Sequence, residues 1–74
     1  MTTATKSSGI GKRVRERRLE MGLTALALAR KIGMSEFTLS RIENGRFPSV
    51  SNLHKLAAAL GVGADYLLAD EKIG

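Results

Sequence analysis

Apolar residues recur every three or four positions along most of this chain, the spacing that places side chains on one face of an α-helix. The pattern predicts five short helices, at about 10–21, 25–32, 36–44, 50–60 and 64–68. Thr24, Ser35 and Ser49 stand directly before the middle three segments, where a hydroxyl caps a helix start. The alternation of apolar and polar positions that marks strands does not occur in the sequence, so we expect an all-α fold.

Glycines separate the predicted helices, and Gly22, Gly33, Gly45 and Gly61 follow the first four segments. Pro48 lies in the loop before the fourth segment, where it breaks no helix. Helices of this length are marginal alone in water, so contacts between them must hold the fold. The residues predicted to face inward are Ile10, Val14, Arg18, Met21, Leu28, Ala29, Ile32, Leu39, Ile42, Val50, Leu53, Leu56, Ala57 and Leu60.

The organisation expected is one small domain at 10–69 with two tails, because 74 residues are too few for two domains. Residues 1–9 are rich in Thr, Ser, Lys and Gly and predict a flexible N-terminal tail, and 70–74 form a short C-terminal one. No run approaches the roughly 18 apolar residues of a membrane span, and no signal peptide opens the chain. We expect a cytoplasmic protein.

The sequence offers little material for catalysis or metal binding. It contains no cysteine and a single histidine, His54, which has no potential ligand at a suitable spacing. We therefore expect no cofactor, no metal and no enzymatic activity.

Positive charge gathers in the N-terminal part of the chain. Residues 1–50 carry ten basic and four acidic side chains, a net +6, and residues 51–74 carry two and three, a net −1, which together give +5. A basic surface of this kind favours a polyanion such as nucleic acid, although basic residues can also simply solvate a helix. The near-neutral C-terminal third indicates packing or self-association.

Only Gly33–Ser35 separates the second predicted helix from the third. A tight joint with a glycine sets two helices at a steep angle, the helix-turn-helix arrangement, in which the second helix enters the DNA major groove. Leu39 and Ile42 anchor this helix inward. The residues left facing outward are Glu36, Phe37, Thr38, Ser40 and Arg41.

A set of motifs then gives a family resemblance: Gly22-Leu23-Thr24, Leu28-Ala29, Gly33-Met34-Ser35, Ser40-Arg41-Ile42-Glu43-Asn44-Gly45 and Pro48-Ser49. With them, the segment 10–69 resembles the helix-turn-helix domain of phage repressors and Cro proteins, the Xre family. The resemblance implies a compact five-helix, lambda-repressor-like fold, with the helix-turn-helix at its second and third helices. It also implies a sequence-specific, DNA-binding regulator of transcription, prokaryotic or phage-encoded.

Four outward residues of the third helix are the candidates for reading bases. Arg41 has a planar fork that matches guanine O6 and N7, and the resemblance implies the same role, with a phosphate contact as the alternative. Glu36 can accept a hydrogen bond from cytosine N4 or stabilise the helix dipole. Phe37 can pack on thymine methyl groups or fold back on Met34. Thr38 suits an A·T pair or a phosphate.

The candidate contacts to the DNA backbone are Thr24, Ser35, Ser40, Asn44 and Arg46. The resemblance implies such contacts at the start of the second helix and just after the third, and the charge of Arg46 agrees. Asn44 also suits a helix end. Ala25 stands where the family usually has a phosphate-binding glutamine, so anchoring there would depend on Thr24 and main-chain N–H groups.

The resemblance further implies an ion pair between Arg18 and Glu43 that links the first and third helices. Leu26 is either half-buried or part of a protein contact.

The expected partner is double-stranded DNA, read by a homodimer on a two-fold operator with half-sites about 34 Å apart. Leu67, Leu68 and Ile73, in the near-neutral C-terminal region, are the candidate dimer contacts. The alternative function is an antitoxin-like protein-binding module that also regulates its own synthesis.

Overall fold

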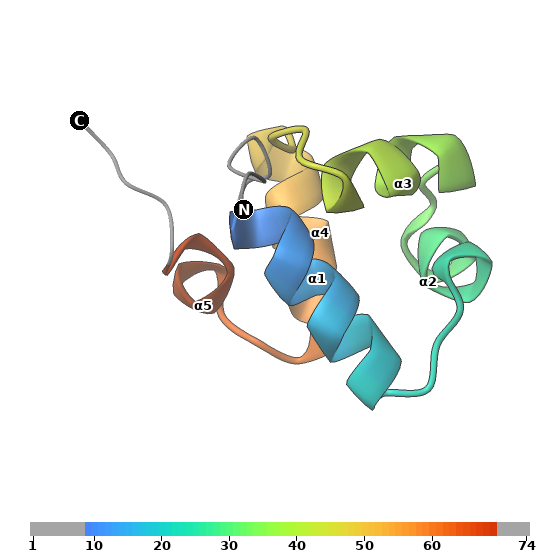
Figure 1. Cartoon of the computed structure of the whole chain (residues 1–74), viewed down its shortest axis with the longest axis horizontal. Coiled ribbons are helices and arrows are strands. Elements are labelled where there is room, and N and C mark those ends of the chain that lie inside the picture. The colour runs from blue at the N-terminus through green and yellow to red at the C-terminus, as the bar shows by residue number, and fades with distance from the viewer. Residues whose placement is uncertain (1–8, 70–74) are drawn as a thin grey trace, which may run out of the picture.

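The structure is a computed structural model and describes residues 9–69. Within this range it contains helices and no strand, which confirms the all-α prediction (Figure 1). The elements are α1 (Gly9–Glu20), α2 (Ala25–Ile32), α3 (Glu36–Glu43), α4 (Val50–Leu60) and α5 (Ala64–Leu68). Gly9, predicted as the end of a tail, begins α1, and the rest of both predicted tails lies outside the described residues. None of these helices is long and apolar enough to cross a membrane.

Three helices begin at a hydroxyl that closes their first turn. In each, the side-chain oxygen accepts a hydrogen bond from the backbone N–H three residues further on, at 3.0–3.1 Å. Thr24 caps α2, Ser35 caps α3 and Ser49 caps α4, as the sequence predicts. Because such bonds satisfy N–H groups that have no partner inside the helix, they fix the residue at which each helix starts.

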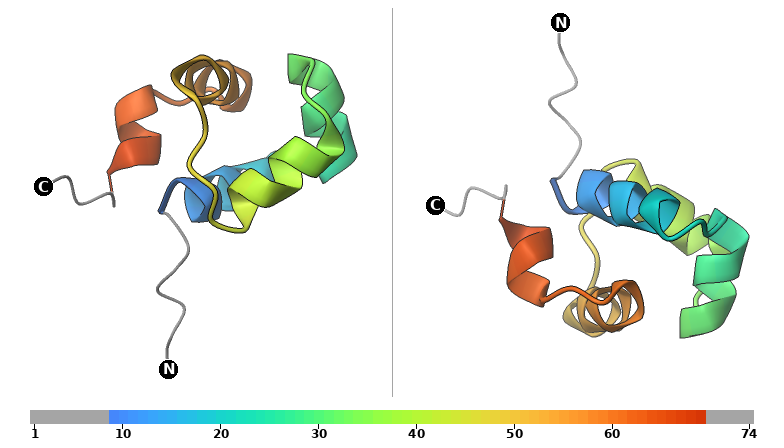
Figure 2. Two further views of the ribbon diagram at one scale, coloured as in Figure 1. Left: turned by 90° about the horizontal axis from the view of Figure 1, so that it is seen from above. Right: turned by 90° about the horizontal axis from the view of Figure 1, so that it is seen from below.

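The joint between α2 and α3 turns the chain sharply within three residues. Gly33 ends α2 in the left-handed conformation, with φ at 70°, which glycine adopts without steric cost. Ser35 then caps α3 immediately. The two helices consequently cross at a steep angle, as Figure 2 shows, which is the arrangement expected of a helix-turn-helix.

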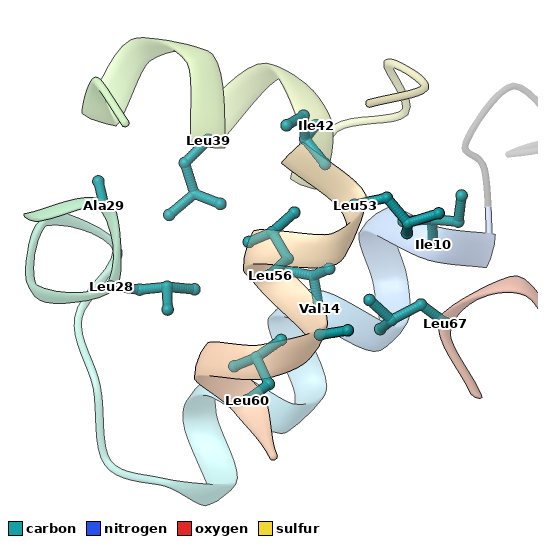
Figure 3. Packing of buried hydrophobic residues seen from close by; sticks show 11 residues of the cluster. Ile10, Val14, Leu28, Ala29, Leu39, Ile42, Leu53, Leu56, Leu60 and Leu67 are labelled. Atoms are coloured by element: carbon teal, nitrogen blue, oxygen red, sulfur yellow. The ribbon is translucent and has the colours of Figure 1, made fainter. Parts of the chain in front are cut away.

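A single apolar cluster fills the space between the five helices (Figure 3). α4 supplies its centre and packs against α1, α2 and α5, while α3 packs on α1 and α2. Its buried members are Ile10, Val14, Leu28, Ala29, Leu39, Ile42, Leu53, Leu56, Ala57, Leu60 and Leu67.

Two residues predicted to face inward lie at the surface instead. Val50 shares the apolar face of α4, but at the first position of that helix its side chain is 71% exposed. Met21 follows the last residue of α1, Glu20, and is therefore in the turn to α2 and exposed. In both cases the helical period continues past the point at which the neighbouring helices cover it.

Leu67 corrects the prediction of the dimer contact. Its side chain is fully buried in the core of its own chain, where α5 packs on α1 and α4. It is therefore not available to a second copy. Leu68 is partly buried against the same core, and Ile73 lies outside the described residues.

Arg18 brings a charge into this core and satisfies it completely. Its Nε donates to Oε2 of Glu43 at 2.8 Å, its Nη2 to Oε1 of Glu43 at 3.0 Å, and its Nη1 to the carbonyl of Leu23 at 2.9 Å. The hydrogen bond to Glu43 raises the pKa of Arg18, against the opposing effect of burial, so the guanidinium stays charged. This pair ties α1 to the end of α3.

Gly11 allows the close approach of α1 to α3. A Cβ on Gly11 would overlap the carbonyl oxygen of Ile42 and lie 2.9 Å from that of Glu43. The two backbones thus meet at the same end of α3 that the ion pair holds.

We expect Glu43→Ala to lower the free energy of unfolding by about 3 kcal/mol or more, because the buried Arg18 charge loses its partner. Urea denaturation measures the loss. Glu20→Ala is the matched control, since the Arg17–Glu20 pair is exposed, and its removal costs less than about 1 kcal/mol. Equal stability of Glu43→Ala and the wild type would contradict a structural role for the pair.

Replacement of glycine by alanine usually stabilises a helix interior, by about 0.5–1 kcal/mol. We expect the opposite sign for Gly11→Ala, a loss of about 1–3 kcal/mol, because the new methyl group overlaps the backbone of α3. Thermal denaturation gives the sign directly, and a higher midpoint than that of the wild type would show that the two helices are not in close contact here.

Candidate nucleic-acid interface

α3 has one buried and one exposed face. Leu39 and Ile42, with 0% and 2% of their surface exposed, point into the core, as Figure 3 shows. On the other face Phe37 is 70% exposed, and Glu36 and Arg41 are exposed beside it. The helix lies on the outside of the bundle, where it packs mainly on α1 and α2 (Figure 1).

Phe37 and Arg41 contact each other on the exposed face. The guanidinium carbon of Arg41 lies over the Phe37 ring, 5.4 Å from its centroid. Residues four apart are neighbours on a helix, and a cation over an aromatic face is an attractive arrangement. Because most of the Phe37 surface is exposed, the ring is not buried in the protein.

Thr38 is less outward than predicted. Its side chain is half-buried, and its Oγ1 accepts a hydrogen bond from the Ser35 hydroxyl at 2.9 Å. Ser35 uses its only O–H in that bond, whereas the O–H of Thr38 can still donate to another group. Thr38 also lines a shallow depression of about 360 Å³ between α3 and the start of α4, together with Ile42, Arg46, Phe47, Pro48, Ser49 and Asn52.

Asn44 closes the C-terminal end of α3. Its side-chain Nδ2 donates to the carbonyl of Ser40 at 2.8 Å, and its backbone N–H donates to the same carbonyl at 3.0 Å. Asn44 itself keeps an ordinary φ of −95°, and Gly45 takes the positive φ, at 120°. Asn44 therefore has the structural role that the sequence left open, and Thr24 and Arg46 are exposed.

The basic side chains of α1 are largely engaged within the fold, which sequence reasoning missed apart from Arg18. Arg17 Nε donates to the carbonyl of Leu60 at 2.9 Å, at the end of α4, and Arg17 Nη1 pairs with Glu20 at 3.2 Å. Arg13 lies over the Tyr66 ring, 4.9 Å from its centroid. Arg41, on α3, and Arg46, just after it, are both exposed.

The remaining candidate positions show no second site. Leu26 is 40% exposed and His54 is exposed. Within residues 9–69 no three His, Cys, Asp or Glu side chains come together as metal ligands.

A family model described as helix-turn-helix matches residues 14–67. The chain belongs to the helix-turn-helix family. This membership confirms the predicted family and the predicted fold class.

Two curated relatives of this helix-turn-helix chain are described as transcriptional regulators. One, from Rhodospirillum rubrum and described as lying in the ATPase CF(0) region, is 41% identical over 66 residues, which cover 88% of this chain and 61% of the relative. Another, from Methanothermobacter thermautotrophicus, is 43% identical over 49 residues, covering 65% of this chain and 71% of the relative. The first relative is thus considerably longer than the present chain.

A solved structure shares the helix-turn-helix fold closely. The biofilm regulator SinR in complex with DNA superposes with a TM-score of 0.75 at 38% sequence identity, over 80% of this chain and 97% of SinR as crystallised. The two curated relatives are described as transcriptional regulators, and the SinR structure is that of a regulator bound to DNA.

Substitutions on the two faces of α3 are expected to differ in their effect on stability. Leu39→Ala is expected to lower the free energy of unfolding by about 2–5 kcal/mol, because it opens a cavity in the core. Phe37→Ala is expected to change it by less than about 0.5 kcal/mol, since the ring is exposed. Chemical denaturation of both variants checks this, and comparable losses would contradict the assignment of the two faces.

Proposed function

We propose that this protein is a sequence-specific DNA-binding regulator of transcription that inserts α3 into the major groove. The observation that carries the proposal is the division of α3, in which Leu39 and Ile42 are buried while Phe37 and Arg41 are exposed. A helix fixed on one face and furnished with donors and a ring on the other suits groove insertion. The family membership and the DNA complex of SinR support the same function. We propose that it acts in the cytoplasm of a prokaryotic or phage-infected cell.

Base reading is assigned to the exposed side of α3. Arg41 donates to guanine O6 and N7, and Phe37 meets thymine methyl groups. Glu36, in the first turn, accepts from cytosine N4, and it lowers affinity for sites without such a donor because phosphates repel it. Thr38 uses its remaining O–H at the edge of the groove.

Backbone binding is assigned to the two ends of the helix-turn-helix. Thr24 caps α2, and the free N–H groups of that first turn attract a phosphate, a role that Ala25 cannot share. Arg46, exposed just beyond α3, supplies a charge. Ser40 and Asn44 can add donors at the end of α3, and the Ser35 cap orients its start.

Binding as a homodimer is part of the proposal. The protein extends 31 × 23 × 21 Å, so one copy presents one α3 to one half-site. Two half-sites about 34 Å apart require two copies, and pairing raises the effective affinity. Since Leu67 is buried, a dimer contact in this region involves the partly exposed Leu68 and the surface around it.

Selection of binding sites from random duplex oligonucleotides, followed by a salt titration, tests the proposal. A two-fold consensus should emerge, and log Kd should rise steeply with log salt, because several phosphate contacts release counterions. Weak binding without sequence preference or salt dependence would contradict it, and would favour the antitoxin-like protein-binding module.

The roles of Arg41 and Arg46 predict different kinds of loss. Arg41→Ala should relax the preference at one base pair, a change of about 1–3 kcal/mol in discrimination, whereas Arg46→Ala should weaken all sequences alike and reduce the salt slope by about one. Kd measurements on the consensus and on single-base variants separate the two. Lys55→Ala, which removes the same charge from an exposed residue of α4 outside the proposed contacts, is the control. Uniform loss in both arginine variants would overturn the division of roles.

A further inference from the structure

The contact between Phe37 and Arg41 is a composite surface on the exposed face of α3. The guanidinium lies over the ring at 5.4 Å from its centroid, and 70% of the Phe37 surface still faces solvent. Within residues 9–69 no carboxylate or carbonyl takes a hydrogen bond or ion pair from the Arg41 guanidinium. In this part of the chain, the Phe37 ring is therefore the group that orients the Arg41 guanidinium.

The contact with the Phe37 ring leaves the hydrogen-bond donors of Arg41 available. A contact with the face of an aromatic ring uses the charge of the guanidinium but none of its five N–H donors. The ring also limits the rotamers of a long side chain, so less freedom is lost when the donors meet their target. The ring thus orients Arg41 while the N–H donors of its guanidinium remain available to a ligand.

The ring supplies a second, apolar element directly beside the donors. Its neighbours on the exposed face, Glu36 and Ser40, are polar, so Phe37 is not part of a broad apolar patch that would dock a protein. A single exposed ring next to a fork of donors fits a ligand that offers a small apolar group next to two acceptors.

In the major groove, that combination of groups has a defined source. Guanine presents the acceptors O6 and N7, and the 5-methyl group is the apolar group that thymine presents there. 5-Methylcytosine carries the same methyl group at the same ring position. A pyrimidine with a 5-methyl group on the 5′ side of a guanine places both features side by side on one strand.

We infer that the Phe37–Arg41 pair reads a 5-methylpyrimidine–guanine step, with Arg41 on the guanine and Phe37 on the methyl group. The inference rests on the proposed function and adds the identity of the step to it. Binding then depends on the methyl group itself, so this helix distinguishes thymine from uracil and 5-methylcytosine from cytosine next to the contacted guanine.

The experiment uses the wild-type protein and the duplex obtained by site selection. The consensus should contain a 5′-TG-3′ step in each half-site. Replacement of that thymine by deoxyuridine removes only the methyl group and should weaken binding about fourfold per contacted step, the value of one buried methyl-sized group. In a second pair of duplexes the step is 5′-CG-3′, and 5-methylation of its cytosine should strengthen binding by a similar factor.

Protein variants assign the effect to the ring. Phe37→Ala should bind the thymine and deoxyuridine duplexes equally, and it should retain the stability of the wild type because Phe37 is exposed. Phe47→Ala is the matched control, since Phe47 is also an exposed phenylalanine, 54% accessible, and lies outside the pair; it should keep the full methyl dependence.

The outcomes separate this inference from the function on which it rests. A salt-sensitive consensus with no 5-methylpyrimidine–guanine step, equal binding of thymine and deoxyuridine duplexes by the wild type, or a methyl dependence that survives in Phe37→Ala overturns the inference and leaves DNA regulation standing. The absence of any consensus overturns the proposed function as well.

Discussion

A helix of eight residues is too short to persist alone in water, so α3 exists because Leu39 and Ile42 hold it against the core. The same two contacts determine which way the rest of the helix faces. Once they are buried, Phe37 and Arg41 have no direction left but outward. The inner residues of α3 thus stabilise the helix, and in the proposed function its outer residues contact the DNA.

The basic side chains of this small fold serve its structure as well as its surface. Much of the positive charge in α1 serves the structure, because Arg18 binds Glu43, Arg17 binds the end of α4, and Arg13 lies over Tyr66. The net charge of the sequence thus overstates the number of cations on the proposed DNA-binding face. In the proposed function, a smaller set of cations around α3 contacts the DNA, and their positions matter more than their number.

The features that sequence predicted well are local ones. A hydroxyl before an apolar stripe is a cap whatever surrounds it, so the starts of α2, α3 and α4 were predictable to the residue. Whether a residue is covered depends on a second element, which periodicity does not reveal: Val50 proved exposed and Leu67 proved buried. The contact of Arg41 with Phe37 has the i,i+4 spacing that could have revealed it, but the rotamers that close it were not available from the sequence. An arginine on an apolar stripe did signal a missing partner, and the family resemblance named it as Glu43.

Arg18 ties a loop to the two helices that it joins, since it also donates to the carbonyl of Leu23, just ahead of α2. Lifting α3 away from the bundle would break the Arg18–Glu43 pair and expose Leu39 and Ile42 at the same time, so a partial opening confined to α3 is costly. The amide hydrogens of α3 should accordingly exchange with solvent more slowly than those of a helix that frays locally. In the proposed function, α3 therefore reaches the DNA already folded, and its backbone loses little conformational entropy on binding.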